Sequence, residues 1–210
     1  MSGTLFWDVD TQYDFMMADG RLYVPGSEEI IPALRRLTDH AHANGVRILA
    51  SADDHVPGHR ELSETPDWKG TFPDHCMRGT PGQAKINGTA LRQPLVIEPS
   101  PEDPDVLAAQ VLKHDGDLLF LKHWFDVFTN PNLLPVLDAL APDRIVLYGV
   151  ALDVCDRYAI EGLLRHRPGI PVSLVIDAVR AIDPTASEAL FSDWAARGVA
   201  MVTTDEVVTG

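Results

Sequence analysis

Three residues of this 210-residue chain could together form a nucleophilic centre: Asp10, Lys122 and Cys155. A cysteine sulfur can attack a carbonyl carbon, a carboxylate can take the thiol proton, and an ammonium can hold the resulting ion pair. Cys155 follows residues 148–154, a pattern typical of a strand, a tight turn and the start of a helix. The positive end of a helix macrodipole lowers the pKa of a thiol, so this position favours a thiolate.

Each of the two charged partners also has a simpler interpretation. Asp10 follows an apolar run and shares a strand face with Asp8, yet a single aspartate there often caps a helix or forms a turn. Another alternative is the Asp-x-Asp-x-Thr motif of haloacid-dehalogenase-like phosphatases, although Thr11 follows Asp10 without the intervening residue. Lys122 ends an apolar run, where it is either a solvated surface charge or a group that lowers the pKa of a neighbour.

A second group of residues has the composition of a metal site. Asp53, His55 and His59 are close in sequence, and His75 follows in the same irregular segment. Imidazole and carboxylate together are the ligands of catalytic zinc, manganese or iron sites. Asp53 and His55 alternate, so both can point the same way on an extended backbone. Solvated loop histidines, or a metal-binding protein without catalysis, are the simpler alternatives.

Apolar, β-rich runs alternate with helical patterns and must position these residues. The predicted strands are residues 4–9, 46–51, 95–98, 117–121, 144–149, 172–176 and 199–202. One predicted helix is capped by Ser27 and closed by Asn44-Gly45, and two others cover residues 153–166 and 184–196. Runs apolar on both faces and separated by helices indicate a parallel sheet covered on both sides, hence a three-layer α/β fold.

The candidate residues all follow strands of this predicted sheet. If the strand order is 3-2-1-4-5-6, as in a doubly wound sheet, Asp10, Lys122 and Cys155 converge at one switch point. The segment at about 53–89 has no helical or strand period and follows the second strand. A loop of that length inside a compact domain is usually functional.

Composition narrows the partners and the compartment. Seventeen basic and 31 acidic residues give a net charge of -14, which would repel a nucleic-acid backbone. The N-terminus does not resemble a secretory signal, and no apolar run is long enough to cross a bilayer. Two cysteines are too few for a disulfide scaffold. We therefore expect one cytoplasmic domain over residues 1–210 with no nucleic-acid or membrane partner, and a homo-oligomer remains open.

Taken in order, these motifs resemble the isochorismatase-like cysteine hydrolases, and within them the nicotinamidase (pyrazinamidase) branch. Residues 10–15 match the family's aspartate-to-phenylalanine segment, and residues 53–55 match its metal-binding Asp-x-His. Residues 72–82 resemble the segment that contributes a further metal histidine. Lys122 and the turn at residues 149–155 complete the match, which spans nearly the whole chain.

The resemblance implies a six-stranded parallel sheet between helices and a cysteine amidase that converts nicotinamide, and pyrazinamide with it, to the free acid and ammonia. Cys155 is then the nucleophile, Asp10 the acid and base, and Lys122 the residue that stabilises the charged pair. The backbone amides of Ala151 and Cys155 form the oxyanion hole, with a cis peptide between Val150 and Ala151. A sibling enzyme acting on another small amide is the nearest alternative.

The resemblance also implies a divalent metal ion and an aromatic pocket. The ion, expected to be zinc with iron or manganese as alternatives, is held by Asp53, His55 and His75, with His59 as a less secure ligand. Phe15 and Phe72 sandwich the substrate ring. Asp8 replaces an apolar residue usual in the family, which indicates either a second buried acid or a different substrate.

Overall fold

The computed structural model describes residues 3–210, and its strands form one parallel sheet of seven. In chain order the strands are β1 (Thr4–Val9), β2 (Arg47–Asp53), β3 (Leu95–Ile97), β4 (Leu118–Lys122), β5 (Arg144–Val150), β6 (Val172–Arg180) and β7 (Ala200–Val202). Across the sheet the order is β3-β4-β2-β1-β5-β6-β7, and every neighbouring pair is parallel.

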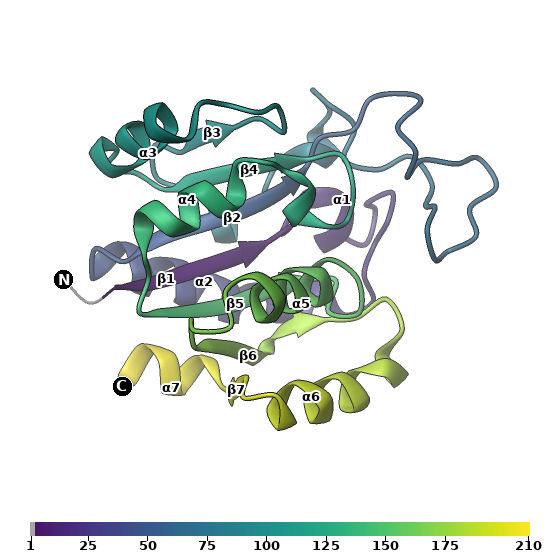
Figure 1. Cartoon of the computed structure of the whole chain (residues 1–210). Helices are drawn as coiled ribbons and strands as arrows, with labels where there is room; N and C mark the ends of the chain where they lie inside the picture. The colour runs from purple at the N-terminus through teal and green to yellow at the C-terminus, as the bar shows by residue number, and fades with distance from the viewer. Residues whose placement is uncertain (1–2) are drawn as a thin grey trace.

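Helices cover both faces of the sheet, so the predicted three-layer α/β class is confirmed. The helices are α1 (Tyr13–Met16), α2 (Ser27–Ala43), α3 (Pro104–Lys113), α4 (Leu133–Leu140), α5 (Cys155–His166), α6 (Ser187–Ala196) and α7 (Thr204–Thr209). Figure 1 shows α3, α4 and α5 in front of the sheet and α2 behind it. Among residues 3–210, no helix combines the length and apolar character that crossing a bilayer requires.

The sheet has one strand more than the six implied by the family resemblance. The additional strand is β3, which pairs only with β4 at the edge of the sheet, through Leu95 beside Leu118 and Ile97 beside Phe120. If β3 is set aside and the others are numbered along the chain, the observed order is the expected 3-2-1-4-5-6. The extra strand therefore widens one edge and leaves the switch point beside β1 unchanged.

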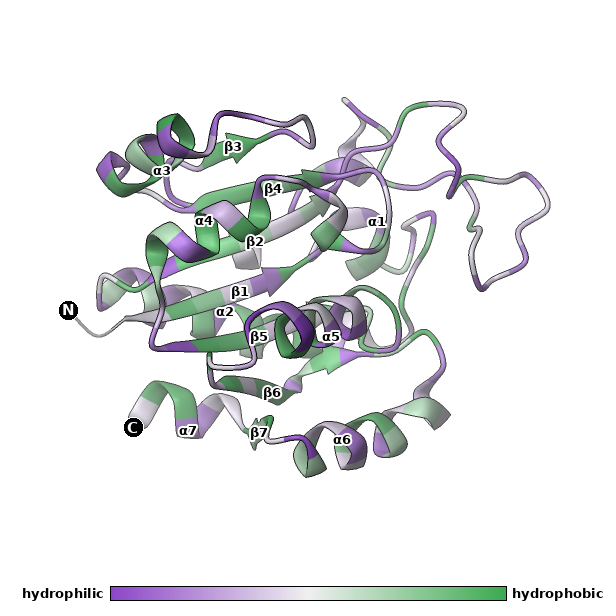
Figure 2. Ribbon diagram, viewed as in Figure 1, coloured by the Kyte–Doolittle hydropathy of each residue, from purple (hydrophilic) through white to green (hydrophobic). Residues whose placement is uncertain are grey.

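The central strands are apolar because both of their faces are buried. In β5, Ile145 to Tyr148 have no exposed surface, and Phe6 and Trp7 of β1 are equally enclosed. Figure 2 shows hydrophobic residues concentrated in the strands and along the inner sides of the helices. Near-continuous apolar strands are the pattern expected of a parallel sheet with helices on both faces.

The predicted cap of the first long helix is wrong by one residue. The N-cap of α2 is Gly26, whose φ of 76° lies in the left-handed region that glycine adopts without strain. The hydroxyl of Ser27 instead donates to the carbonyl oxygens of Phe15 and Met16, both at 3.0 Å. Ser27 thus ties the start of α2 to the segment that follows β1.

The irregular segment predicted after the second strand leaves the carboxyl edge of the sheet. Residues 54–94 contain only two short 3-10 helices, Pro81–Gln83 and Asn87–Thr89. Figure 1 shows the first part of this segment extending away from the body of the molecule. Isolated β-bridges, including His55 beside Met77 and Leu62 beside Phe72, connect different parts of this segment.

Gly149 lets β5 approach the end of β1 closely. Its φ is 137°, and a Cβ atom there would lie 2.1 Å from the carbonyl oxygen of Val9. We expect Gly149→Ala to lower the free energy of unfolding by about 3 kcal/mol or more, because both the backbone and the contact become strained. Urea denaturation measures this loss, with Gly45→Ala as the control. Gly45 also has a positive φ, of 66°, but nothing within 4 Å, so equal losses for both variants would contradict the steric argument.

Candidate active site

Asp10, Lys122 and Cys155 come together at the carboxyl edge of four adjacent strands. Asp10 follows β1, Lys122 is the last residue of β4, and Cys155 begins α5 just after β5. Strand β2 lies between β1 and β4, and its last residue, Asp53, is in register with Lys122. The long lysine side chain therefore reaches across the end of β2 toward Asp10.

The ammonium of Lys122 is the centre of this cluster. Its Nζ lies 2.9 Å from Oδ2 of Asp10, forms an ion pair with Oδ1 of Asp53, and is 3.8 Å from Sγ of Cys155. Oδ1 of Asp10 accepts a 2.7 Å hydrogen bond from the hydroxyl of Ser51. All of these charged side chains are fully buried. One ammonium thus lies between two carboxylates beside a sulfur, and all three charged side chains are in the interior of the protein.

The buried environment raises the pKa of both the lysine and the thiol. Burial alone would lower the pKa of Lys122, but Asp10 and Asp53 outweigh it and hold that pKa well above its usual value. Burial raises the pKa of the Cys155 thiol well above its ordinary range, and Lys122 offsets only part of this. Burial thus acts on the thiol in the opposite direction to the helix start, which by itself favours a thiolate. A reaction at this sulfur would require the thiol proton to move to a nearby carboxylate.

The turn between β5 and α5 presents backbone N–H groups beside the sulfur. The peptide between Val150 and Ala151 is cis, as the family resemblance implies. The N–H groups of Leu152, Val154 and Asp156 donate to carbonyl oxygens of Arg180 and Ala151. Cys155 is the first residue of α5, and the N–H groups of a first helical turn have no partner within their own helix.

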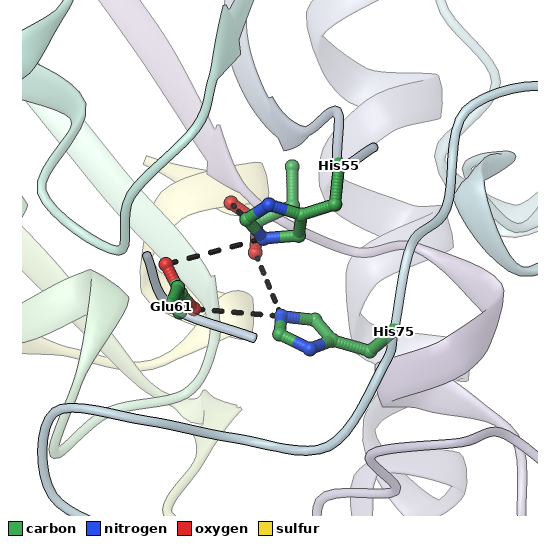
Figure 3. Close-up of side chains that lie close together, drawn as sticks. His55, Glu61 and His75 are labelled. Carbon is green, nitrogen blue, oxygen red and sulfur yellow. Dashed lines mark ion pairs between the residues drawn. The ribbon is translucent and has the colours of Figure 1, made fainter. Parts of the chain in front are cut away.

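A second cluster lies next to the first and shares Asp53 with it. One ligand atom from each of Asp53, His55, Glu61 and His75 lies within 4.8 Å of the others, and all four residues are buried. Nε2 of His75 is 3.6 Å from Oδ2 of Asp53 and 3.5 Å from Oε1 of Glu61. Nε2 of His55 is 3.9 Å from Oε2 of Glu61. Figure 3 shows the two imidazoles and the Glu61 carboxylate turned toward one another.

The four residues fit a divalent metal ion. Oδ2 of Asp53, Nε2 of His55, Oε2 of Glu61 and Nε2 of His75 are all buried without a hydrogen-bond partner. Buried polar atoms are rarely left unpaired, and here they converge on one point. Two imidazole nitrogens and two carboxylate oxygens are a ligand set that zinc, iron and manganese accept. This cluster is the candidate metal centre.

The charge of the cluster also favours a cation. Burial lowers the pKa of His55 to about 4, so its ring is a neutral ligand. Burial acts in the same direction on His75, but Asp53 and Glu61 raise its pKa to about 10. Nδ1 of His75 lies 2.7 Å from the carbonyl oxygen of Pro73, which directs Nε2 toward the two carboxylates. The field that holds a proton on His75 would also attract a divalent ion.

His59 lies beside the metal cluster instead of in it. Its Nδ1 is 3.2 Å from Nδ1 of His55, on the side of that ring away from Nε2. Its ring also contacts His123, with ring centroids 4.4 Å apart. The structure therefore places Glu61, and not His59, with Asp53, His55 and His75, and His59 lies against the ring of His55. Glu61 was missed because nothing in the spacing distinguishes it from Glu64.

Glu61→Gln tests this assignment because it keeps the shape of the side chain and removes its charge. We expect zinc affinity to fall by about a hundredfold or more, since even residues behind the ligands contribute about 10–100-fold. Competition with a chromogenic chelator measures the affinity. Glu64→Gln is the matched control, because Glu64 is exposed in the same loop. Equal affinity for Glu61→Gln and wild type would remove Glu61 from the ligand set.

The predicted aromatic residues border a small cavity that reaches from the metal cluster to the sulfur. Its lining residues are Phe15, Leu22, Asp53, Glu61, Phe72, His75, Ala151, Val154, Cys155 and Ile182. The ring centroid of Phe15 is 5.3 Å from that of His75, and that of Phe72 is 6.3 Å away. The cavity therefore has a mostly apolar lining, in which the polar side chains are those of Asp53, Glu61 and His75 of the metal cluster and the thiol of Cys155.

Asp8 is not placed for phosphoryl transfer. It is fully buried, its Oδ2 lies 3.0 Å from Nζ of Lys85, and its Oδ1 accepts a 2.9 Å hydrogen bond from the hydroxyl of Thr11. A carboxylate with these partners is occupied in the interior of the protein. The phosphatase alternative therefore loses one of the two aspartates that it needs.

Comparison with known proteins agrees with this architecture. A nicotinamidase/pyrazinamidase from Mycobacterium tuberculosis is 25% identical over 197 residues, 92% of this chain and 95% of that protein. A pyrazinamidase from Pyrococcus horikoshii, solved in complex with zinc, superimposes with a TM-score of 0.73 at 25% identity, covering 96% and 99% of the two chains. An N-carbamoylsarcosine amidase from Thermoplasma acidophilum shares the fold, with a TM-score of 0.70 at 24% identity and 98% of both chains covered.

These likenesses extend over nearly the full length of each protein, as does the family model. The model of the isochorismatase domain matches residues 5–206, which include every strand end described above except the first residue of β1. The chain therefore belongs to the isochorismatase family.

Proposed function

We propose that this protein is a metal-dependent cysteine amidase that hydrolyses nicotinamide, and pyrazinamide with it, to the free acid and ammonia. One observation carries the proposal: the Lys122 ammonium joins Asp10 and Asp53 within 3.8 Å of the Cys155 sulfur, beside a four-residue metal cluster. The nicotinamidase and pyrazinamidase relatives support the choice of substrate. Fold alone does not specify a substrate, so the choice of substrate also rests on the residues of the site.

Acylation begins with the transfer of the Cys155 proton to Asp10. The sulfur attacks the carboxamide carbon, the C–S bond forms, and the carbonyl π electrons move to the oxygen. Backbone N–H groups of Ala151 and Cys155 donate to this oxyanion. Asp10 then returns its proton to the amide nitrogen, the C–N bond breaks, and ammonia leaves a thioester on Cys155. Throughout these steps the Lys122 ammonium stabilises the negative charge on Asp10 and on the Cys155 sulfur.

Hydrolysis of the thioester reverses these roles. A water molecule gives a proton to Asp10 as its oxygen attacks the thioester carbon. The tetrahedral intermediate collapses, the C–S bond breaks, and nicotinic acid is released. The proton on Asp10 returns to the sulfur, which regenerates the neutral thiol that burial favours.

Asp53, His55, Glu61 and His75 would hold the metal ion. When bound, the ion supplies a Lewis acid for the pyridine nitrogen, directly or through a water molecule. Phe15 and Phe72 pack against the ring of the substrate, and their contacts with His75 keep both aromatic walls next to the metal cluster. Positioning the amide over the sulfur in this way lowers the entropic barrier to attack.

The lining of the cavity favours a neutral, flat ring. Phe15, Leu22, Phe72, Val154 and Ile182 are apolar, and no arginine of residues 3–210 lines the cavity. Outside the metal cluster, a carboxylate-bearing amide would lack a counter-charge there and would have to lose its hydration. This supports nicotinamide over the charged substrates expected for sibling amidases.

Ammonia release from a panel of amides tests the proposal. Protein reconstituted with zinc, iron or manganese is assayed with nicotinamide, pyrazinamide, benzamide and N-carbamoylsarcosine. We expect fast release from the first two and slow release from benzamide, which lacks the ring nitrogen. Equal rates for benzamide and nicotinamide would contradict the role of the metal. Turnover of N-carbamoylsarcosine alone would replace the proposal with a sibling amidase.

A further inference from the structure

Asp8 is a buried acid that the proposed reaction does not use. It lies within β1, two residues before Asp10, and has no exposed surface. Its Oδ2 lies 3.0 Å from Nζ of Lys85, whose side chain is 9% exposed. Lys85 belongs to the segment after the metal loop, 77 positions away along the chain. A protein with an apolar pair of similar size in place of a buried ion pair is often as stable or more stable, so stability alone does not explain why this pair is present.

The ion pair belongs to a longer buried chain of polar groups. The hydroxyl of Thr11 donates to Oδ1 of Asp8 at 2.9 Å and lies 2.6 Å from the hydroxyl of Thr89. Asp8 and Thr11 stand at the end of β1, whereas Lys85 and Thr89 stand at the two ends of residues 85–89. Two separate side-chain contacts thus join these two segments.

Backbone pairing runs alongside these contacts. The N–H of Tyr13 donates to the carbonyl oxygen of Ala84 at 2.8 Å, and that of Ile86 donates to the carbonyl oxygen of Thr11 at 3.0 Å. Gln12 and Lys85 form an antiparallel bridge between them. Such a short pairing is weakly specified by its backbone alone, because few hydrogen bonds oppose a shift of register.

Gln12 connects this pairing to the active site. Its side chain is fully buried, its Oε1 accepts from the N–H of Asp53 at 2.7 Å, and its Nε2 donates to the carbonyl oxygen of Asp53 at 2.8 Å. Nε2 also donates to the carbonyl oxygen of Gln83 at 2.8 Å. The amide thus clamps the backbone of Asp53, the residue shared by the metal cluster and Lys122.

We propose that Asp8 and Lys85 are positioning residues, whose buried ion pair fixes the register of residues 11–13 against residues 84–86 and so holds the Gln12 clamp on Asp53. The inference rests on the proposed function only in taking Asp53 as a metal ligand. The clamp itself can be measured without metal or substrate. Asp8 then serves to position Asp53. From the sequence alone, Asp8 indicated either a second buried acid or a different substrate.

The test compares Lys85→Met with the double variant Asp8→Leu/Lys85→Met. Lys85→Met leaves a buried carboxylate without its cation and should unfold at a lower temperature. The double variant replaces the pair with apolar side chains and should recover most of that stability. Hydrogen exchange is followed by NMR in metal-free protein, with the buried Val146 amide as the internal reference. Relative to that reference, the amide hydrogen of Asp53 should exchange about tenfold faster in both variants than in wild type. Both should also bind zinc about tenfold more weakly.

His42→Leu is the matched control. Nε2 of His42 lies 2.8 Å from Oδ2 of the buried Asp117. Asp117 directly precedes β4, so it lies at the amino ends of the strands, away from Asp53. This variant should lose stability without changing the relative exchange of the Asp53 amide. Unchanged exchange in Lys85→Met, or exchange and zinc affinity that return to wild type in the double variant, would overturn the proposal. Neither exchange outcome depends on whether nicotinamide is hydrolysed, so failure of the proposed function is seen separately.

Discussion

Cys155→Ala should abolish amide hydrolysis, with kcat/KM for nicotinamide falling by about ten-thousandfold or more. Among residues 3–210, Cys155 is the one hydroxyl- or thiol-bearing residue that lines the cavity, its sulfur lies 3.8 Å from Lys122, and removal of a catalytic nucleophile typically costs several orders of magnitude. The rate of ammonia release, with nicotinamide as the only substrate, measures the loss of activity. Zinc affinity should stay at the wild-type value, because Cys155 is not among the four residues of the metal cluster.

Cys76→Ala is the control for this variant, because Cys76 is the only other cysteine and is also buried. It follows His75 directly, so it also reports whether loss of any buried thiol near the metal cluster affects the rate. We expect Cys76→Ala to keep most of the activity. A Cys155→Ala variant within tenfold of the wild-type rate would show that the sulfur forms no intermediate.

Lys122→Met should reduce both stability and activity. The ammonium lies between Asp10 and Asp53 in a fully buried site, so its removal leaves Asp10 without its cation and Asp53 with one cation fewer beside it. Loss of one partner from such a group costs about 3–5 kcal/mol in the free energy of unfolding. The kcat/KM for nicotinamide should fall by about a hundredfold or more, because the charged pair is no longer stabilised during proton transfer.

Urea denaturation of metal-free protein measures the stability change, and ammonia release measures the activity. Lys113→Met is the matched control, because Lys113 is exposed near the end of α3 and should shift stability by less than about 0.5 kcal/mol. Zinc should restore part of the stability of Lys122→Met, since it would neutralise Asp53. A Lys122→Met variant as stable as the Lys113→Met control would mean that the two carboxylates do not depend on the ammonium.

The strands and the edge that carries the site could be predicted from local sequence. The run from Thr4 to Val9 is a strand with the predicted bounds, and the other six predicted runs also form strands. Apolar runs bounded by turns reflect burial on both faces, which is a local property of the sequence. Because parallel strands end at the same edge, residues just after them were expected to meet there.

Charge states and the fourth metal residue depended on packing. Burial raises the pKa of the Cys155 thiol more than Lys122 lowers it, and burial is a property of the assembled fold. Glu61 joins Asp53, His55 and His75 because the chain on either side of it is paired with Phe72, whose N–H donates to the carbonyl oxygen of Glu61 at 2.8 Å and which forms a bridge with Leu62. That contact spans a loop without a periodic pattern, so spacing did not reveal it.

The amino-acid order by itself determined the layered α/β class, the residues at the strand ends and the family. Those features follow from local hydrophobicity and from short motifs, which each segment carries wherever it lies. Only the tertiary structure decided that Lys122 pairs with two carboxylates, that Glu61 and not His59 lies with Asp53, His55 and His75, and that Asp8 pairs with Lys85. The physical reason is that these contacts join side chains from segments far apart in sequence, where burial and charge are set by neighbours that folding alone brings together.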